Sequence, residues 1–310
     1  MCSRCIIQII LLASLIVGSE ARAEYSLRIV TSSPASVYQQ TAQTLSDALR
    51  NSHSHIAIEQ QVLPKGVPND KGLTPNYAIP HPDWQVAIGS KACENLLRHT
   101  RETATLCAFI TAAAFKQLLQ KYPERDRVHG LCIDQPLPRL IRLATLLHSE
   151  QPNHRIGLLS TDNESETAIA SDKVELHITQ LGIDDNPIQQ LKPLVSNNDS
   201  VIVLPGNSHL NRLSARLILQ LSLKHKTPVI GFSKKYTDAG ALLSIHPSPE
   251  DIALDITRIL ESKPDSAATP TLQPGSNFSL SMNKNVARKL RYQLDMETLR
   301  KSLDTQHSGL

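Results

Sequence analysis

The chain has 310 residues, of which 40% are hydrophobic and 20% charged, and its formal net charge is +3. This composition is typical of a globular protein with an ample core, and the length is enough for two domains. The small net charge, with no basic patch interleaved with aromatic residues, argues against a nucleic-acid partner. Only four Phe, one Trp and six Tyr are present, so we expect an aliphatic core.

The first residues have the pattern of an export signal. A lone arginine precedes an apolar run over 6–17, and Ala21-Arg22-Ala23 then matches the small-x-small cleavage rule. We predict that residues 1–23 are a cleavable signal peptide. A membrane anchor is the alternative, but about a dozen apolar residues fall short of the roughly twenty that span a bilayer. A lipoprotein is disfavoured because neither Cys2 nor Cys5 follows the apolar run.

Three cysteines remain after this cleavage: Cys93, Cys107 and Cys132. An odd number allows at most one disulfide and leaves at least one free thiol, and spacing alone does not choose a pair. All three lie in or beside apolar segments, which favours buried thiols over a set of metal ligands.

Apolar runs alternate with helical patterns from the first mature residues onward. Predicted strands cover 27–30, 56–62, 84–88, 106–110 and 128–133, followed after Gln151 by 156–159, 174–178, 201–204 and 229–232. Amphipathic helices are predicted between most of them, although residues 64–82 are too rich in proline and glycine for regular structure. Such alternation predicts a parallel α/β architecture in two lobes that divide near Gln151.

The stretch 201–232 carries the clearest strand-helix-strand unit. Its first strand stops at Pro205-Gly206, and Asn207 or Ser208 then stands where the N-cap of a helix belongs. Leucines at 210, 213, 217 and 221 are predicted to form one buried face. Asn207 and Ser208 either cap this helix or face a ligand crevice beyond the carboxyl ends of the strands.

The C-terminal third continues the alternation. We predict a strand over 239–245, a helix opened by Ser248-Pro249, a linker over 263–275, a strand over 278–282 and a helix near 286–290. The tail, 301–310, is expected to be disordered.

No motif of catalysis is present. The sequence has no nucleophile elbow, zinc-protease motif, phosphate-binding loop or dinucleotide-binding fingerprint, so we predict neither an enzyme nor a bound cofactor. His53 and His55 flank a serine before a strand, where a solvated pair is favoured over a metal site.

Small polar residues recur where predicted strands meet helices. Each is explained by helix capping alone, but together they would surround a cleft with hydroxyls and amides suited to a small zwitterion or anion. The residues are Ser32, Ser33, Gly89, Ser90, Thr111, Thr161, Asn207 and Ser208.

Three short motifs near the C-terminus resemble those of a known family in the same order. Thr227-Pro-Val-Ile-Gly-Phe, Ala239-Gly-Ala-Leu-Leu-Ser and Phe278-Ser-Leu-Ser-Met-Asn are similar to the closing signature of ABC-transporter substrate-binding proteins of the tryptophan-binding-like family. Upstream, Val86-Ala-Ile-Gly-Ser resembles their glycine turn and His154-Arg-Ile-Gly-Leu-Leu the strand that opens their second lobe. The resemblance runs from about Ser26 to Leu294.

The resemblance implies a periplasmic binding protein of type I, with two Rossmann-like parallel-sheet lobes joined by a three-strand hinge. The first lobe would comprise 24–134 and 240–265, and the second 135–239 and 276–300. Crossovers are expected near 133–135, 235–240 and 274–277.

In function, the resemblance implies a monomeric periplasmic protein that closes on an amino-acid-like small ligand and delivers it to an ABC permease in the inner membrane. The implied ligand contacts add Ala112 and Asp238 to the polar residues above, with Asp238 pairing with a ligand ammonium and helix amides holding a carboxylate.

Some positions depart from the family pattern. The proline-rich segment 64–82 replaces a helix, and Gly206 replaces an acidic residue. The alternative is therefore a periplasmic sensor or adaptor of the same fold that signals to a membrane protein without transport. A hydrolase is a third option, disfavoured because no activated nucleophile can be named.

Overall fold

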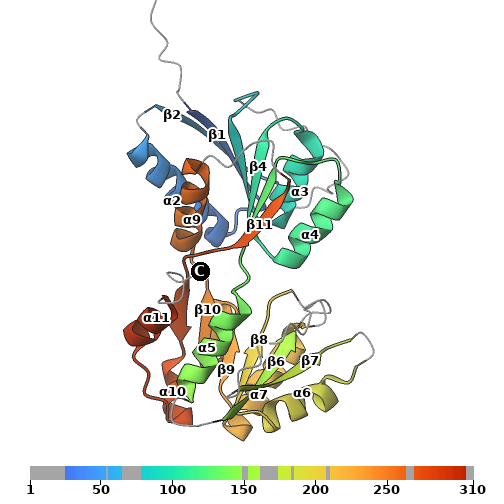
Figure 1. Cartoon of the computed structure of the whole chain (residues 1–310), viewed down its shortest axis with the longest axis vertical. Helices are drawn as coiled ribbons and strands as arrows, with labels where there is room; N and C mark the ends of the chain where they lie inside the picture. Colours follow the sequence, from blue (N-terminus) through green and yellow to red (C-terminus); the bar gives the residue numbers. More distant parts are fainter. Residues whose placement is uncertain are drawn as a thin grey trace, which may run out of the picture.

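This computed structural model describes residues 25–53, 55–64, 78–148, 153–160, 174–182, 185–206, 210–262 and 269–304. The predicted signal peptide, 1–23, lies outside them. Two α/β lobes, each built on a six-stranded sheet, are stacked along the long axis of the molecule (Figure 1). The fold class predicted from the sequence, two mostly parallel α/β lobes, is confirmed.

The sheet of the first lobe is parallel throughout, in the order β11-β5-β4-β3-β1-β2. Its strands are β1 (Tyr25–Thr31), β2 (Ile56–Val62), β3 (Trp84–Ile88), β4 (Ala104–Ile110), β5 (Val128–Cys132) and β11 (Thr271–Pro274). Helices cover both faces, so the central strands are buried on both sides and read as continuous apolar runs.

Each face of this sheet packs against its own pair of helices. α2 (Ser36–Ser52) and α9 (Pro249–Glu261) lie together on one face, and their leucines and isoleucines share a cluster with Leu27, Ile29 and Val86. α3 (Ser90–His99) and α4 (Ala112–Lys121) cover the other face, where Phe115 and Leu96 are fully buried.

The second lobe has the order β12-β10-β9-β8-β6-β7, with only β12 antiparallel to its neighbour. The strands are β6 (His154–Ser160), β7 (Val174–Gln180), β8 (Ser200–Val203), β9 (Val229–Gly231), β10 (Leu243–His246) and β12 (Ser279–Met282). The helices are α5 (Leu137–Leu147), α6 (Pro187–Ser196), α7 (Arg212–His225), α8 (Lys234–Ala239), α10 (Lys284–Leu290) and α11 (Met296–Asp304).

The chain passes between the lobes three times, over 133–136, 247–248 and 275–278. The expected second crossover, 235–240, is wrong, and so is the assignment of 240–246 to the first lobe. These residues form α8 and β10 of the second lobe, because Leu243 and Ser244 pair with β9 and the chain leaves this sheet only after His246. Gly240, with a φ of 129°, ends α8 rather than forming a hinge.

Two predictions about helix ends are also corrected. α7 begins at Arg212, and Asn211 is its N-cap, accepting hydrogen bonds from the backbone N–H groups of Leu213 and Ser214. The buried residues of α7 are Ser214, Ile218, Leu219 and Ser222 rather than the predicted leucines, and Leu213 is 77% exposed. At the C-terminus, α11 extends through Asp304 with Leu303 buried, so 301–304 are not a disordered tail.

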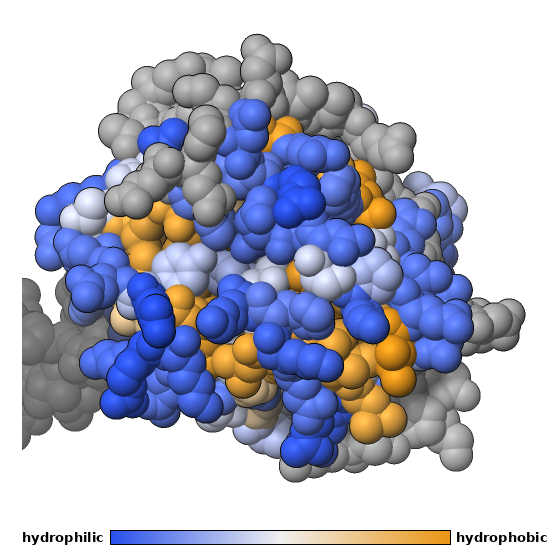
Figure 2. All heavy atoms as spheres, turned by 90° about the horizontal axis from the view of Figure 1, so that it is seen from below, coloured by the Kyte–Doolittle hydropathy of each residue, from blue (hydrophilic) through white to orange (hydrophobic). Residues whose placement is uncertain are grey.

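The surface at the far end of the second lobe is mixed in character. Figure 2 shows this end from below, where hydrophobic areas are interrupted by hydrophilic side chains. Among the described residues only five large hydrophobic side chains are exposed: Val62, Ile188, Leu213, Leu223 and Leu254. These five side chains are distributed over both lobes, so they do not expose a whole hydrophobic layer of either lobe.

Candidate functional site

The connections between the lobes place the carboxyl ends of both sheets at the same boundary. β5 ends at Cys132 and leads into α5 of the second lobe, whereas β10 ends at His246 and leads into α9 of the first. The neighbouring strands are parallel to these two, so their carboxyl ends lie on the same edges. Ligands of open α/β sheets bind beyond such edges. The boundary between the lobes is thus the candidate site.

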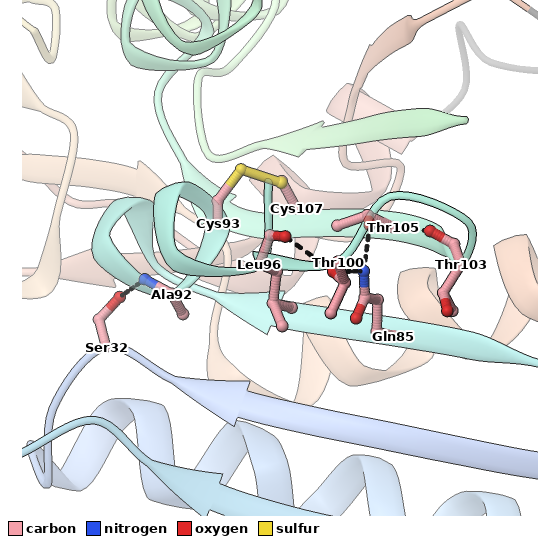
Figure 3. Close-up of a disulfide and its surroundings, with 9 residues drawn as sticks. All are labelled: Ser32, Gln85, Ala92, Cys93, Leu96, Thr100, Thr103, Thr105 and Cys107. Carbon is pink, nitrogen blue, oxygen red and sulfur yellow. Dashed lines mark hydrogen bonds between the residues drawn. A yellow bond between two sulfur atoms is a disulfide. The ribbon is translucent and has the colours of Figure 1, made fainter. Parts of the chain in front are cut away.

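At the end of β1, the side chain of Ser32 is buried and forms a hydrogen bond within the first lobe. Its side chain is 9% exposed, and its Oγ accepts a hydrogen bond of 2.9 Å from the backbone N–H of Ala92 in the first turn of α3 (Figure 3). Gly89 precedes this helix with a φ of 95°, and a Cβ there would lie 2.5 Å from the Ser32 Oγ. Only glycine fits this turn.

The neighbouring serines differ in their surroundings. Ser33 is half-buried, and its Oγ accepts from the backbone N–H of Ala35 at 3.3 Å. Ser90, the first residue of α3, is exposed. Since β1 and β3 are adjacent, the structure brings Ser32, Ser33, Gly89 and Ser90 together at one corner of the sheet edge.

The start of α4 carries an acidic partner that the sequence did not indicate. Thr111 caps the helix through its side chain, which accepts from the Ala114 N–H at 3.2 Å. The N–H of Ala112 donates to the Oδ2 of Asp134 at 2.8 Å, across from the end of β5. Burial is the main cause that raises the pKa of Asp134, although the Ala112 N–H and the charge of Lys116 oppose it.

Asp238 is the predicted site residue whose surroundings fit its expected role least. It lies on α8 of the second lobe, its side chain is 60% exposed, and both carboxylate oxygens are 3.0 Å from the Nζ of Lys234. The sequence pattern did not foresee this i,i+4 ion pair. Three further candidates, Thr161, Asn207 and Ser208, lie outside the described residues.

An aromatic pair stands near the carboxyl end of β4. Phe109 lies at a bulge between Ala108 and Ile110 and has a φ of 56°. Its ring packs edge-on against Tyr38 of α2, with centroids 5.3 Å apart. A bulky residue in left-handed backbone is uncommon, and such strain gathers at functional sites. No sequence signal marks this bulge.

The disulfide forms between Cys93 on α3 and Cys107 on β4, with Cα atoms 5.3 Å apart (Figure 3). It ties the helix that follows Gly89 to the centre of the sheet. Cys132 is the buried free thiol, and burial raises its pKa to about 12. Within the part of the chain that the structure describes, no three His, Cys, Asp or Glu side chains are grouped to hold a metal ion.

No protein-family model matches this chain, and no curated protein matches it in sequence. Solved structures do resemble it. A ligand-free, open substrate-binding protein with adhesive properties from Clostridium difficile aligns with a TM-score of 0.62 at 14% identity, covering 87% of this chain and 96% of that one. A conserved domain protein from Vibrio cholerae gives 0.55 at 17% identity, covering 89% and 97%.

A third solved structure, described as an ABC domain in complex with L-Trp from Streptococcus pneumonia, aligns with a TM-score of 0.53 at 15% identity and covers 89% of this chain and 98% of that one. Identities this low carry the fold and not the ligand. Each of these alignments covers at least 87% of this chain, so the agreement extends over both lobes. The chain therefore has the two-lobed fold of the type I periplasmic binding proteins, as found in ABC-transporter solute-binding proteins.

Proposed function

We propose that this chain is the periplasmic solute-binding component of an ABC-type uptake system and that it binds an amino-acid-like small ligand between its lobes. The observation that carries this proposal is the arrangement of the two sheets, whose carboxyl edges border one boundary crossed by three connections. Closure of such lobes around a ligand is a rigid-body hinge motion. No catalytic role is proposed for any residue.

An oxidising compartment is supported by the Cys93–Cys107 disulfide, since such bonds persist mainly outside the cytosol. The predicted signal peptide over 1–23 agrees with this. None of the helices in the described part of the chain is both long and apolar enough to cross a membrane.

One observation favours the sensor or adaptor instead. The hydroxyls of Ser32, Ser33 and Thr111 all accept backbone N–H groups of their own lobe. If these bonds persist, the first lobe offers fewer groups to a ligand than the sequence predicts. A protein of this fold that signals through contact with a membrane protein would not need any groups for binding a ligand.

The test is a ligand screen on protein comprising residues 24–310. Thermal unfolding is followed with each of the common amino acids and short peptides, and every stabilising compound is then titrated by calorimetry. A ligand present at a hundred times its Kd stabilises the folded state by about 2.7 kcal/mol, which a melting curve resolves readily. Saturable one-to-one binding supports the transport component. Absence of any binding, with capture of a membrane partner, supports the adaptor.

A further inference from the structure

Asp134 occupies a distinctive place at the boundary between the lobes. It lies in the first crossover, directly beyond β5, and its Oδ2 accepts the Ala112 N–H at the start of α4. Its own backbone N–H and the thiol of Cys132 also donate to its carboxylate. A carboxylate has about four acceptor positions, so a further donor can be accommodated.

The contact between Asp134 and the Ala112 N–H determines which charge a ligand group can carry at the start of α4. The N-terminus of a helix normally attracts an anion, because its first N–H groups are unpaired and the helix dipole is positive there. In α4 that position already holds a carboxylate, and the Ala114 N–H is taken by Thr111. A ligand carboxylate at this place would meet a negative charge and no free donor from these two residues.

The next residue supplies an independent sign of a missing partner. Gln135 is 9% exposed, and its Oε1 accepts a 2.8 Å hydrogen bond from the Nη1 of Arg139. A guanidinium only donates, so this bond fixes which end of the amide is oxygen. The Nε2 has no hydrogen-bond partner among the described residues. Buried donors are almost always paired, so this N–H group is open to an acceptor that the described residues do not supply.

Building on the proposed function, we propose that Asp134 determines ligand specificity: the ligand presents its ammonium group to Asp134 at the first crossover and an oxygen acceptor to Gln135, and its anionic group is bound elsewhere. This differs from the assignment expected from the sequence, in which Asp238 binds the ammonium and helix amides hold the carboxylate. Asp238 instead forms its ion pair with Lys234 in the second lobe.

Two substitutions separate the charge of Asp134 from its capping role. Asp134→Asn keeps an oxygen for the Ala112 N–H but removes the charge. Asp134→Ala removes the carboxylate from the start of α4 altogether. Asp47→Asn is the matched control, because Asp47 is exposed on α2 and contacts Gln43. All are made in protein comprising 24–310.

The probes are amino acids, their cationic carboxamides and their anionic N-acetyl derivatives, with sodium acetate as a plain anion and chloride for equal ionic strength. We expect the unsubstituted protein and Asp47→Asn to be stabilised by compounds with a free ammonium and not by N-acetyl compounds. Asp134→Asn should bind the former about 10- to 100-fold more weakly, the usual effect of losing a charged hydrogen-bond partner. Asp134→Ala alone should be stabilised by acetate.

The outcomes separate this proposal from the function on which it rests. Binding of N-acetyl compounds as tight as that of the free amines, or an unchanged affinity in Asp134→Asn, overturns the role of Asp134 while leaving a solute-binding protein. In a second outcome, acetate stabilises Asp134→Ala but no amino compound binds any of the proteins. This result supports an anion position at the start of α4 but argues against the transport function. If no probe shifts the melting temperature of any of these proteins, the proposal is overturned.

Discussion

The carboxylate of Asp255 on α9 accepts two hydrogen bonds from Asn277 in the third crossover, one from its backbone N–H at 3.2 Å and one from its side-chain Nδ2 at 2.9 Å. Asp255 is 1% exposed, and a Cβ on Gly275 would lie 2.8 Å from its Oδ2. The crossover is therefore held against a helix of the first lobe just before it enters the second.

Replacing Asp255 should destabilise this connection. Asp255→Ala leaves both donors of Asn277 without their acceptor, and we expect a loss of about 2 kcal/mol in the free energy of unfolding. Asp255→Asn keeps one acceptor and should lose less. Urea unfolding followed by circular dichroism measures both. Equal stability of Asp255→Ala and the unsubstituted protein would show that these bonds add nothing to the fold.

The disulfide is expected to stabilise the first lobe substantially. It closes a loop with a sequence separation of 14, for which chain entropy predicts about 3 kcal/mol. Dithiothreitol should lower the melting temperature of the unsubstituted protein and of Cys132→Ala, but not that of the double variant Cys93→Ala, Cys107→Ala. A reductant effect that persists in the double variant would contradict this assignment.

Gly89 is expected to tolerate no side chain. Gly89→Ala places a Cβ against the Ser32 Oγ in backbone that disfavours it, so we expect a loss of about 1–3 kcal/mol. Adding Ser32→Ala removes the nearest obstacle, and the double variant should lose less than the sum of the two single losses. Thermal unfolding of the unsubstituted protein, the two single variants and the double variant measures how strongly the two substitutions are coupled. Strict additivity would mean that the Ser32 contact is not the cause.

The order of strands and helices follows from the sequence because buried parallel strands read as apolar runs. β3, over 84–88, lies within its predicted bounds for this reason. β11 was missed in the expected linker because it is a short and largely exposed edge strand, paired with β5 through its main chain and ending at a proline. A strand of this kind leaves no periodic pattern.

The site was less accessible to sequence reasoning than the fold. Ser32 and Thr111 stand at strand ends as predicted, but their hydrogen-bond partners depend on how helices pack on the sheet. Asp134 is 22 residues from Ala112, and no local pattern relates them. The pairing of Cys93 with Cys107 likewise depends on the packing of α3 against β4, so spacing alone left it open.

A stacked pair of histidines, His154 buried and His148 half-buried, makes stability depend on pH. The rings of His148 and His154 stack with centroids 5.9 Å apart at the amino end of β6, away from the boundary between the lobes. Burial lowers the pKa of both, and the charge of His154 lowers that of His148 further, while Asp199 opposes these effects. The folded protein thus resists protonation that the unfolded chain accepts near pH 6.5.

The sign of the dependence follows directly. Stability is fully present above about pH 6.5 and falls as the pH is lowered towards the depressed pKa values, since the unfolded state binds more protons in that range. His129 and His246, whose pKa values burial also lowers, contribute in the same direction. The free energy of unfolding should therefore decrease steadily from pH 7.5 to pH 5.

Two substitutions test the contribution of the pair. His148→Phe keeps a ring against His154 and Tyr292 but removes a titrating group, so the decrease in stability between pH 7.5 and pH 5 should be smaller than in the unsubstituted protein. His53→Phe changes an exposed histidine and should leave the decrease unaltered. Urea unfolding at half-unit pH intervals measures both slopes. A slope in His148→Phe equal to that of the unsubstituted protein would place the pH sensitivity elsewhere, with His129 and His246 the next residues to replace.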